Sequence, residues 1–325
     1  MHSIVSIIIP TYNRKELLAE AVQSCFDQTW RDLEIIIVDD GSADGTDAFV
    51  RERLGDTWTD GRVRYYKQKN AGAAAARNYG LKLAASNYVQ FLDSDDILLS
   101  DKIACQIREL EGERGMESEG CSCYGRMGLR GSPSATQRIG VHCDTPSAYI
   151  SQLCSRVVHG MSTPAPLWRR SFLQSRPGWR TDISLGDDLE YYIRLLRDAK
   201  SLQFVHRELF FVREHLGPRL SDAAQHCERT LSAIRARVAI FESLQYSDYW
   251  DVQTQENFLG AMRTLYANVL HCGTADDIRE LETWILKRAR HPARRLLLPA
   301  LICLRRIFGR QALLGGHRFV MRLRG

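Results

Sequence analysis

Short apolar runs alternate with helix-like segments over the first hundred residues, and this alternation constrains the fold more than any other feature. The runs are rich in β-branched and aromatic residues and end in polar clusters, as expected for buried strands. They occupy residues 3–9, 33–38 and 88–92, with a shorter one at 63–66. Helix-like segments separate them, which predicts right-handed crossovers and a parallel sheet. The predicted class is α/β, with a mostly parallel, Rossmann-like sheet flanked by helices.

Polar side chains follow the three longer strands where each strand ends. The clusters are Pro10-Thr11-Tyr12-Asn13, Asp39-Asp40-Gly41-Ser42 and Asp93-Ser94-Asp95-Asp96. In a parallel sheet, ligands bind beyond the carboxyl ends of the strands. The three clusters are therefore expected to meet at one edge of the sheet and form a binding site there.

The third cluster places three carboxylates within four residues, Asp93 to Asp96. Such close negative charges repel each other unless a cation lies among them, and a hard divalent cation holding phosphate oxygens would relieve that repulsion. The alternative is that these acids cap a helix expected from Ile97 to Leu110, where Asp is common. Three acids next to an apolar strand favour the cation site.

The remaining candidate residues each have a plain structural alternative. Asp40 could accept the N–H of a nucleobase beside the ring of Tyr12, or it could belong to a tight turn at Gly41. Arg77, on an otherwise apolar helix, is either a surface residue or a buried partner for acids such as Asp93. No Gly-rich phosphate loop follows the first strand, so a dinucleotide fold and a P-loop are both disfavoured.

Two later positions could take part in chemistry. Asp187 and Asp188 follow Gly186 at the expected start of a helix, where they could cap it or place a carboxylate with a raised pKa as a general base. His215 follows the strand expected at 204–212, and a single His is more often structural than a ligand unless other ligands converge on it.

Taken in order, these motifs resemble glycosyltransferase family 2 and its GT-A fold. They run Pro10-Thr-Tyr-Asn-Arg14, Val38-Asp-Asp-Gly-Ser-Ala-Asp-Gly-Thr46, Asn70-Ala-Gly72 with Ala76-Arg-Asn78, and Phe91-Leu-Asp-Ser-Asp-Asp96. The resemblance covers roughly residues 3–220 and is densest over 3–100. It implies an inverting, metal-dependent enzyme that moves a sugar from a UDP-sugar, or another nucleotide diphosphate sugar, to a hydroxyl group.

The resemblance also assigns roles to residues. The implied donor-binding residues are Pro10, Thr11, Tyr12, Asp40, Arg77, Asp93 and Ser94. The implied ligands of Mn²⁺ or Mg²⁺ are Asp95, Asp96 and His215, and with these ligands converging the metal role is favoured for His215. Asp188 is implied as the general base, although Asp187 stands where the family usually has Glu.

Other functions compete with this interpretation. A processive polysaccharide synthase would carry membrane spans and a Gln-x-x-Arg-Trp motif, and neither is found. A catalytically silent nucleotide-sugar-binding or scaffold module would lack one of Asp95, Asp188 or His215. A nucleotidyltransferase would need a Gly-rich, basic loop after the first strand. The transferase is therefore preferred, acting on a glycan or lipid-linked acceptor in cell-surface polysaccharide biosynthesis.

The sequence further predicts a domain order and a location. A GT-A domain is expected over 1–220, divided into a nucleotide-binding half (1–100) and an acceptor or catalytic half (101–220), followed by a helical region (221–290) and a basic amphipathic tail (291–325). From Lys287 onward there are 11 Lys and Arg and no acidic residue. We expect this tail to contact an anionic membrane surface peripherally rather than nucleic acid, because no reading aromatics are interleaved. The nine cysteines, an odd number, are scattered without paired spacing, which indicates a reducing cytoplasm.

Overall fold

A computed structural model describes residues 5–56, 58, 61–113, 115–129, 137–139, 145–155, 162–214, 227–272 and 279. The strands are β1 (Val5–Thr11), β2 (Leu33–Asp39), β3 (Val63–Lys67), β4 (Tyr88–Phe91), β5 (Asp96–Leu98), β6 (Gly120–Leu129), β7 (Gln137–Ile139), β8 (Leu167–Arg169) and β9 (Leu202–Glu214). The helices are α1 (Lys15–Phe26), α2 (Thr46–Asp56), α3 (Ala73–Leu83), α4 (Lys102–Glu111), α5 (Pro146–Ser155), α6 (Arg170–Gln174), α7 (Asp187–Asp198), α8 (Cys227–Leu244) and α9 (Val252–Cys272).

One sheet runs through the molecule in the order β3-β2-β1-β4-β8-β6-β9-β5, with β7 paired to β6. The part built from residues 5–91 is parallel throughout, as the alternating pattern predicted. Beyond β4 the sheet becomes mixed, because β8 pairs antiparallel with both β4 and β6. The predicted α/β class is confirmed.

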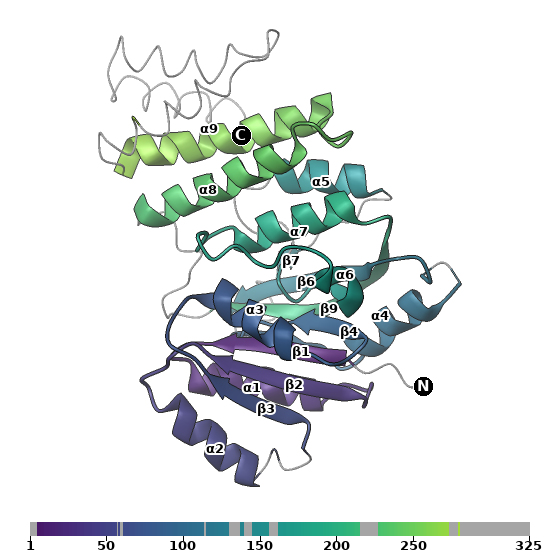
Figure 1. Cartoon of the computed structure of the whole chain (residues 1–325), viewed down its shortest axis with the longest axis vertical. Coiled ribbons are helices and arrows are strands. Elements are labelled where there is room, and N and C mark those ends of the chain that lie inside the picture. The colour runs from purple at the N-terminus through teal and green to yellow at the C-terminus, as the bar shows by residue number, and fades with distance from the viewer. Residues whose placement is uncertain are drawn as a thin grey trace.

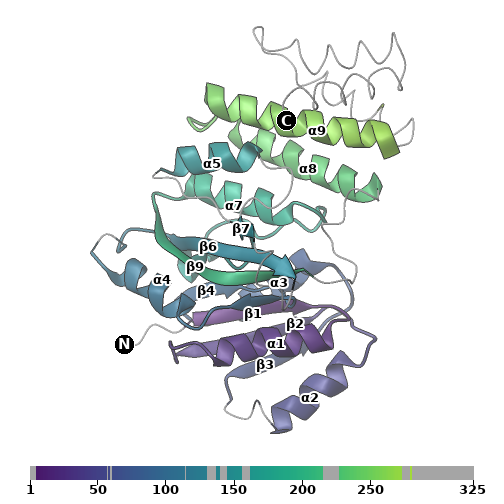
Figure 2. The same cartoon turned by 180° about the vertical axis from the view of Figure 1, so that it is seen from behind.

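Helices cover both faces of the parallel part, which explains why its central strands β1 and β4 are buried along their whole length. Helix α3 lies over the face seen in Figure 1, and α1 lies over the opposite face seen in Figure 2. All seven residues of β1 are buried. Cys25 and Cys105 are buried free thiols, as expected of small core residues.

The predicted helix from Ile97 to Leu110 is wrong at its start. Residues Asp96–Leu98 form the short strand β5, which pairs antiparallel with β9, and helix α4 begins only at Lys102. Asp93 and Asp95 therefore precede a strand and are not the caps of a helix. The pairing that decides this comes from a segment more than a hundred residues away, which local pattern does not show.

Helices α5, α7, α8 and α9 form a stack at one end of the sheet (Figure 1). Helix α8 packs on α7 and α9 packs on α5, so the two described helices of the predicted helical region rest directly on elements before residue 220. None of the described helices combines the length and apolar character needed to cross a bilayer. The basic tail at 291–325 and His215 lie outside the described residues.

Candidate nucleotide-sugar site

Three strand ends meet at one edge of the sheet, as the sequence predicted. In the parallel register Thr11 lies beside Asp39, and Ile8 lies beside Phe91, two residues before Asp93. The backbone N–H of Asp40 donates to the carbonyl of Thr11 over 2.9 Å, which ties the ends of β1 and β2 together. Side chains from three distant parts of the sequence therefore share this edge.

The carboxylate of Asp40 is held by the loop that leads into α3. It accepts hydrogen bonds from the Gln68 amide (2.7 Å) and from the backbone N–H groups of Ala71 (2.9 Å) and Gly72 (2.8 Å). Because two of these reach one oxygen and one reaches the other, the second oxygen keeps acceptor capacity. Gly41, at φ +83°, makes the tight turn that was the alternative explanation for Asp40. A place in this turn is compatible with binding of a nucleobase by Asp40.

The end of β1 supplies the other side of this edge. Tyr12 is 49% exposed, so its ring is available to a ligand. Thr11 is buried, and its hydroxyl oxygen has no hydrogen-bond partner among the residues that the structure describes. Pro10 is buried in the register position opposite Val38, and Ser94 is buried at the end of β4. A buried hydroxyl without a partner is costly unless something binds it.

Arg77 is buried, so its interpretation as a surface residue is wrong. Its guanidinium donates to Asp93 over 2.6 Å and to Asp187 over 2.8 Å, and it lies 4.4 Å from the centre of the Trp179 ring. Burial opposes its charge, but the two neighbouring carboxylates outweigh burial and raise its pKa. One arginine thus joins the strand-end carboxylates to the first turn of α7.

The two acids at the start of α7 have different surroundings. Asp187 is paired with Arg77, whereas Asp188 accepts a hydrogen bond from the backbone N–H of Leu189 over 2.7 Å and forms no ion pair with any described residue. Burial raises the pKa of Asp188 to about 7, and the adjacent charge of Asp187 adds to the rise. A carboxylate with this pKa can take a proton near neutral pH.

The carboxylates that follow β4 are crowded by arginines. Arg14 donates to the carboxylate of Asp95, and Arg213 donates to the backbone carbonyl of Asp95 and to Glu20 over 2.8 Å. Asp96 is buried, and burial together with the charges of Asp95 and Asp93 raises its pKa well above the usual range. Within the described part of the chain, no set of three His, Cys, Asp or Glu side chains is arranged to hold a metal ion.

Three residues of this region were not singled out from the sequence. Trp179 stacks on Tyr191 with ring centres 4.3 Å apart and forms the wall behind Arg77, but its segment shows no periodic pattern. Arg14 belongs to the first motif, and Arg213 lies near the end of β9, one residue past the strand expected at 204–212. Their positions were therefore visible, but their contacts with the loop at 94–96 depend on long-range folding.

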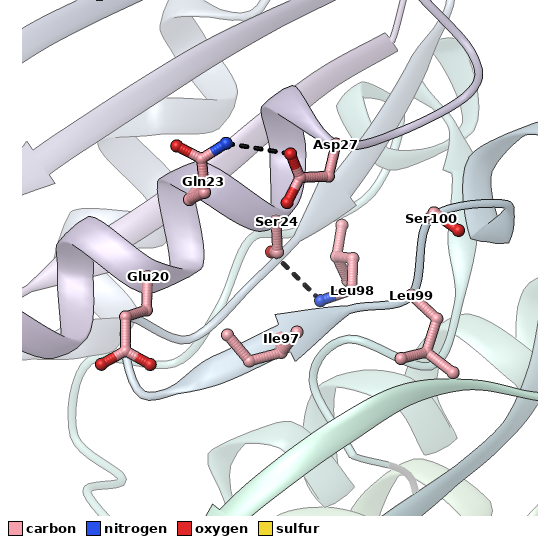
Figure 3. Close-up of a pocket in the computed structure, with 8 residues that line it drawn as sticks. All are labelled: Glu20, Gln23, Ser24, Asp27, Ile97, Leu98, Leu99 and Ser100. Atoms are coloured by element: carbon pink, nitrogen blue, oxygen red, sulfur yellow. Dashed lines mark hydrogen bonds between the residues drawn. The ribbon is translucent and has the colours of Figure 1, made fainter. Parts of the chain in front are cut away.

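A separate open pocket of about 340 Å³ lies between α1 and β5 (Figure 3). Ser24 and the backbone of Leu98 face one another across it, joined by a 3.2 Å hydrogen bond. Glu20 and Asp27 line it from α1 and its end. None of the predicted site residues that the structure describes lines this pocket, so the strand-end edge is the better candidate for the functional site.

Solved structures define the class of fold first. The chain aligns with Staphylococcus aureus TarS 1-349 in complex with UDP-GlcNAc over 97% of its own length and 91% of that chain, with a TM-score of 0.70 and 18% identity. It also aligns with the mannosyltransferase PcManGT of Pyrobaculum calidifontis, in complex with GDP-Man and Mn²⁺, at a TM-score of 0.54 and 19% identity. These similarities establish the GT-A type of fold.

Sequence comparison then identifies the family. Residues 6–127 match the model of glycosyl transferase family 2. Over 112 residues the chain is 41% identical to the Escherichia coli UDP-Glc:alpha-D-GlcNAc-diphosphoundecaprenol beta-1,3-glucosyltransferase WfaP, covering 34% of this chain and 43% of that protein. An uncharacterized glycosyltransferase of Rickettsia felis is 46% identical over 107 residues, which is 33% of this chain and only 17% of the relative's length. Residues 6–127 of the chain therefore belong to glycosyltransferase family 2.

Proposed function

We propose that this chain is an inverting glycosyltransferase that moves a sugar from a nucleotide diphosphate donor, preferably a UDP-sugar, to a hydroxyl group of a glycan or lipid-linked acceptor. The observation that carries the proposal is the Arg77 bridge, which joins Asp93 at the end of β4 to Asp187, next to Asp188. This bridge supports a base that acts close to the donor. The names of WfaP and of the TarS complex support UDP-linked donors and, for WfaP, a diphosphoundecaprenol-linked acceptor.

The donor would lie along the strand-end edge. Tyr12 would offer its ring to the base, Asp40 would accept a base N–H with its spare acceptor capacity, and Thr11 would bond the donor with its unpartnered hydroxyl. Arg77, Asp93 and Ser94 would border the ribose and diphosphate. The tail at 291–325 would bring the site to a membrane-bound acceptor, a role supported by the charge of its sequence.

Replacing Thr11 with Val should weaken donor binding without weakening the fold. The hydroxyl has no partner in the described part of the protein. Its loss should therefore leave stability unchanged or raise it by about 1 kcal/mol, while the Kd for UDP rises about fivefold or more. Calorimetric titration with UDP and thermal unfolding measure the two effects.

Thr254 provides the matched control, because its buried hydroxyl also lacks a partner but lies on α9. Thr254→Val should not change UDP affinity. If Thr11→Val leaves the Kd unchanged too, Thr11 does not contact the donor.

The proposed metal ligands are Asp95, Asp96 and His215, with Mn²⁺ or Mg²⁺ as the ion. The carboxylate oxygens are hard ligands of the kind these ions prefer. Burial and the charges of Asp95 and Asp93 raise the pKa of Asp96 well above its usual range, and a nearby cation would favour its ionised form. A bound ion would neutralise the departing diphosphate as a Lewis acid. Arg14 already pairs with Asp95, and it would share that carboxylate with the ion.

Asp188 would act on the acceptor. In the proposed step the acceptor oxygen forms a bond to the anomeric carbon while the bond from that carbon to the diphosphate breaks, and Asp188 takes the hydroxyl proton. The nucleoside diphosphate leaves with the electron pair. Attack from the face opposite the phosphate inverts the anomeric centre.

The rate should therefore rise with pH around neutrality. A base acts only when ionised, and burial raises the pKa of Asp188 to about 7, so turnover should be small near pH 5.5 and should level off above pH 8. The release of UDP from a UDP-sugar, measured as kcat across this range, should give an apparent pKa near 7. If kcat instead rises with an apparent pKa near the ordinary value of an aspartate, about 4, Asp188 is not the group that titrates.

The experiment that tests the proposal is calorimetric titration of the protein with UDP-glucose, UDP-GlcNAc, GDP-mannose and their nucleotides, with Mn²⁺ and with a chelator. Metal-dependent binding of one donor is expected. Folded protein that binds none of them in the presence of Mn²⁺ would overturn the proposal. Binding of a donor that is never turned over, with or without candidate acceptors, would instead favour a silent binding module.

A further inference from the structure

The loop that leads into α7 fixes the position of the two acids at its start. Gly186 is the N-cap of α7 in a left-handed conformation, at φ +79°, and this cap forms no side-chain hydrogen bond to the helix. The first turn of a helix leaves backbone N–H groups without helical partners. Residues outside the helix must therefore hold this loop in place.

Helix α8 supplies one side of that support. The hydroxyl oxygen of Ser232 accepts hydrogen bonds from two successive backbone N–H groups, those of Ser184 (2.7 Å) and Leu185 (3.1 Å). Ser232 is only 2% exposed, so water is a poor substitute for it. A hydroxyl oxygen has two acceptor lone pairs, and this one uses both on the loop.

The same face of α8 also packs on the loop. Ala236 lies one turn after Ser232, and a Cβ placed on Gly186 would lie 3.3 Å from the Ala236 Cβ. Ile183 forms a small buried cluster with Ala236 and Ala239. Ala236 and Ala239, four and seven residues after Ser232, lie on the same face of α8 as Ser232. Together the three residues form the surface on which residues 183–186 pack.

The other side of the support is Arg77 on α3, whose guanidinium bonds Asp187. The first turn of α7 is thus held between α3 and α8. Of the two acids in this turn, Asp187 is paired with Arg77, and Asp188 has no cation partner among the described residues. A displacement of about 1 Å at such a site can cost a hundredfold in rate.

We infer that Ser232 is a positioning residue for Asp188, and that α8 is part of the catalytic unit. The inference rests on the proposed function, because it takes Asp188 as the base. It also means that the functional unit extends past residue 220, the boundary expected from the sequence. Ser232 does not contact the strand-end residues, so its role differs from donor binding.

The test compares Ser232→Ala with Ser243→Ala in the full chain. Ser243 lies on the same helix and its hydroxyl accepts a 2.8 Å hydrogen bond from Arg197, in the last turn of α7. Both variants lose one hydroxyl acceptor on α8, which faces the loop before α7 in the case of Ser232 and the last turn of α7 in the case of Ser243. The readouts are hydrogen exchange of the backbone amides at 184 and 185, the Kd for the donor, and kcat for UDP release from UDP-glucose or UDP-GlcNAc with water as acceptor.

Ser232→Ala should speed exchange of those two amides and lower kcat about 10- to 100-fold, with the donor Kd unchanged within twofold. Its pH profile should shift below pH 7, because a loosened loop lets water reach Asp188. Ser243→Ala should show none of these changes, and Ser232→Thr, which keeps the hydroxyl, should restore most of the kcat.

Each contrary result has a distinct meaning. Unchanged exchange and unchanged kcat in Ser232→Ala would overturn the positioning role. Equal losses in both serine variants would also overturn it, since they would reflect general stability. Wild-type protein that neither binds nor turns over a nucleotide sugar would refute the proposed function itself, and the inference about Ser232 would fall with it.

Discussion

Replacing Asp188 with Asn should abolish transfer while leaving donor binding intact. The amide cannot take a proton from the acceptor hydroxyl, and a positioned general base is typically worth 10² to 10⁴ in rate. We therefore expect kcat for UDP release to fall at least a hundredfold, with the donor Kd within about twofold of wild type. Calorimetry and a UDP-release assay on the same preparation measure both quantities.

The fold should survive this change. Because burial raises the pKa of Asp188, the folded protein disfavours its ionised form, and that cost grows as the pH rises above the pKa of the unfolded chain. Asn carries no charge, so the melting temperature at pH 8 should equal or exceed that of wild type. A loss of activity with an unchanged or higher melting temperature would separate chemistry from stability.

Asp182→Asn is the matched control for Asp188→Asn. Asp182 lies six residues earlier and forms an exposed ion pair with Arg180. Its replacement should change neither kcat nor Kd, because exposed ion pairs contribute little. If Asp188→Asn keeps its turnover, Asp188 is not the base.

Replacing Arg77 with Met should be the most destabilising single change among the site residues. Met keeps much of the side-chain volume but leaves Asp93 and Asp187 without their shared cation, and breaking a buried ion pair from one side costs about 3–5 kcal/mol. The contact with the Trp179 ring is lost as well. Urea denaturation at pH 7.5 should show the midpoint moving to lower urea by a corresponding amount.

The pH dependence of this loss identifies its cause. Burial raises the pKa of Asp187 and the charge of Arg77 opposes that rise. Without Arg77 the neutral form of Asp187 is favoured further, so acidification should relieve the cost of its charge and the difference from wild type should shrink at pH 5. A difference that does not change with pH would point to lost packing rather than to unpaired charge.

Arg51→Met is the control for Arg77→Met. The pair between Arg51 and Asp47 is exposed on α2, with the arginine side chain 69% exposed. The free energy of unfolding should change by less than about 1 kcal/mol. Arg77→Lys should fall between the two, because an ammonium group cannot bond both carboxylates with the geometry of the guanidinium fork.

Some parts of the structure follow from short stretches of sequence. The parallel strands at 5–11, 33–39 and 88–91 were predictable because apolar runs of this length must be buried on both faces. The meeting of their polar ends followed from the geometry of a parallel sheet, without any knowledge of packing. The helices at 227–244 and 252–272 were also indicated by their apolar spacing.

Other parts could not be predicted in this way. Residues 96–98 look like the start of a helix and form a strand instead, because β9 offers them backbone partners from far along the chain. The pattern also could not tell whether Arg77 faces water or the core, since helical spacing gives a face but not what lies against it. Trp179, which lies against the Arg77 guanidinium, comes from a segment without a pattern.

The amino-acid sequence by itself determined a parallel sheet, three polar strand ends at one of its edges, and a pair of acids at the start of a later helix. It thereby indicated which side chains are chemically able to act. Only the tertiary structure decided which of these side chains are paired with an opposite charge and which residues hold them in position. It pairs Asp187 with Arg77 and leaves Asp188 without a cation among the described residues. It also bonds the loop before them, at Ser184, to Ser232 on a helix 48 residues later in the chain. The physical reason is that charge pairing and burial depend on distances between segments remote in sequence, and neighbouring acids of one type are indistinguishable until those distances are set.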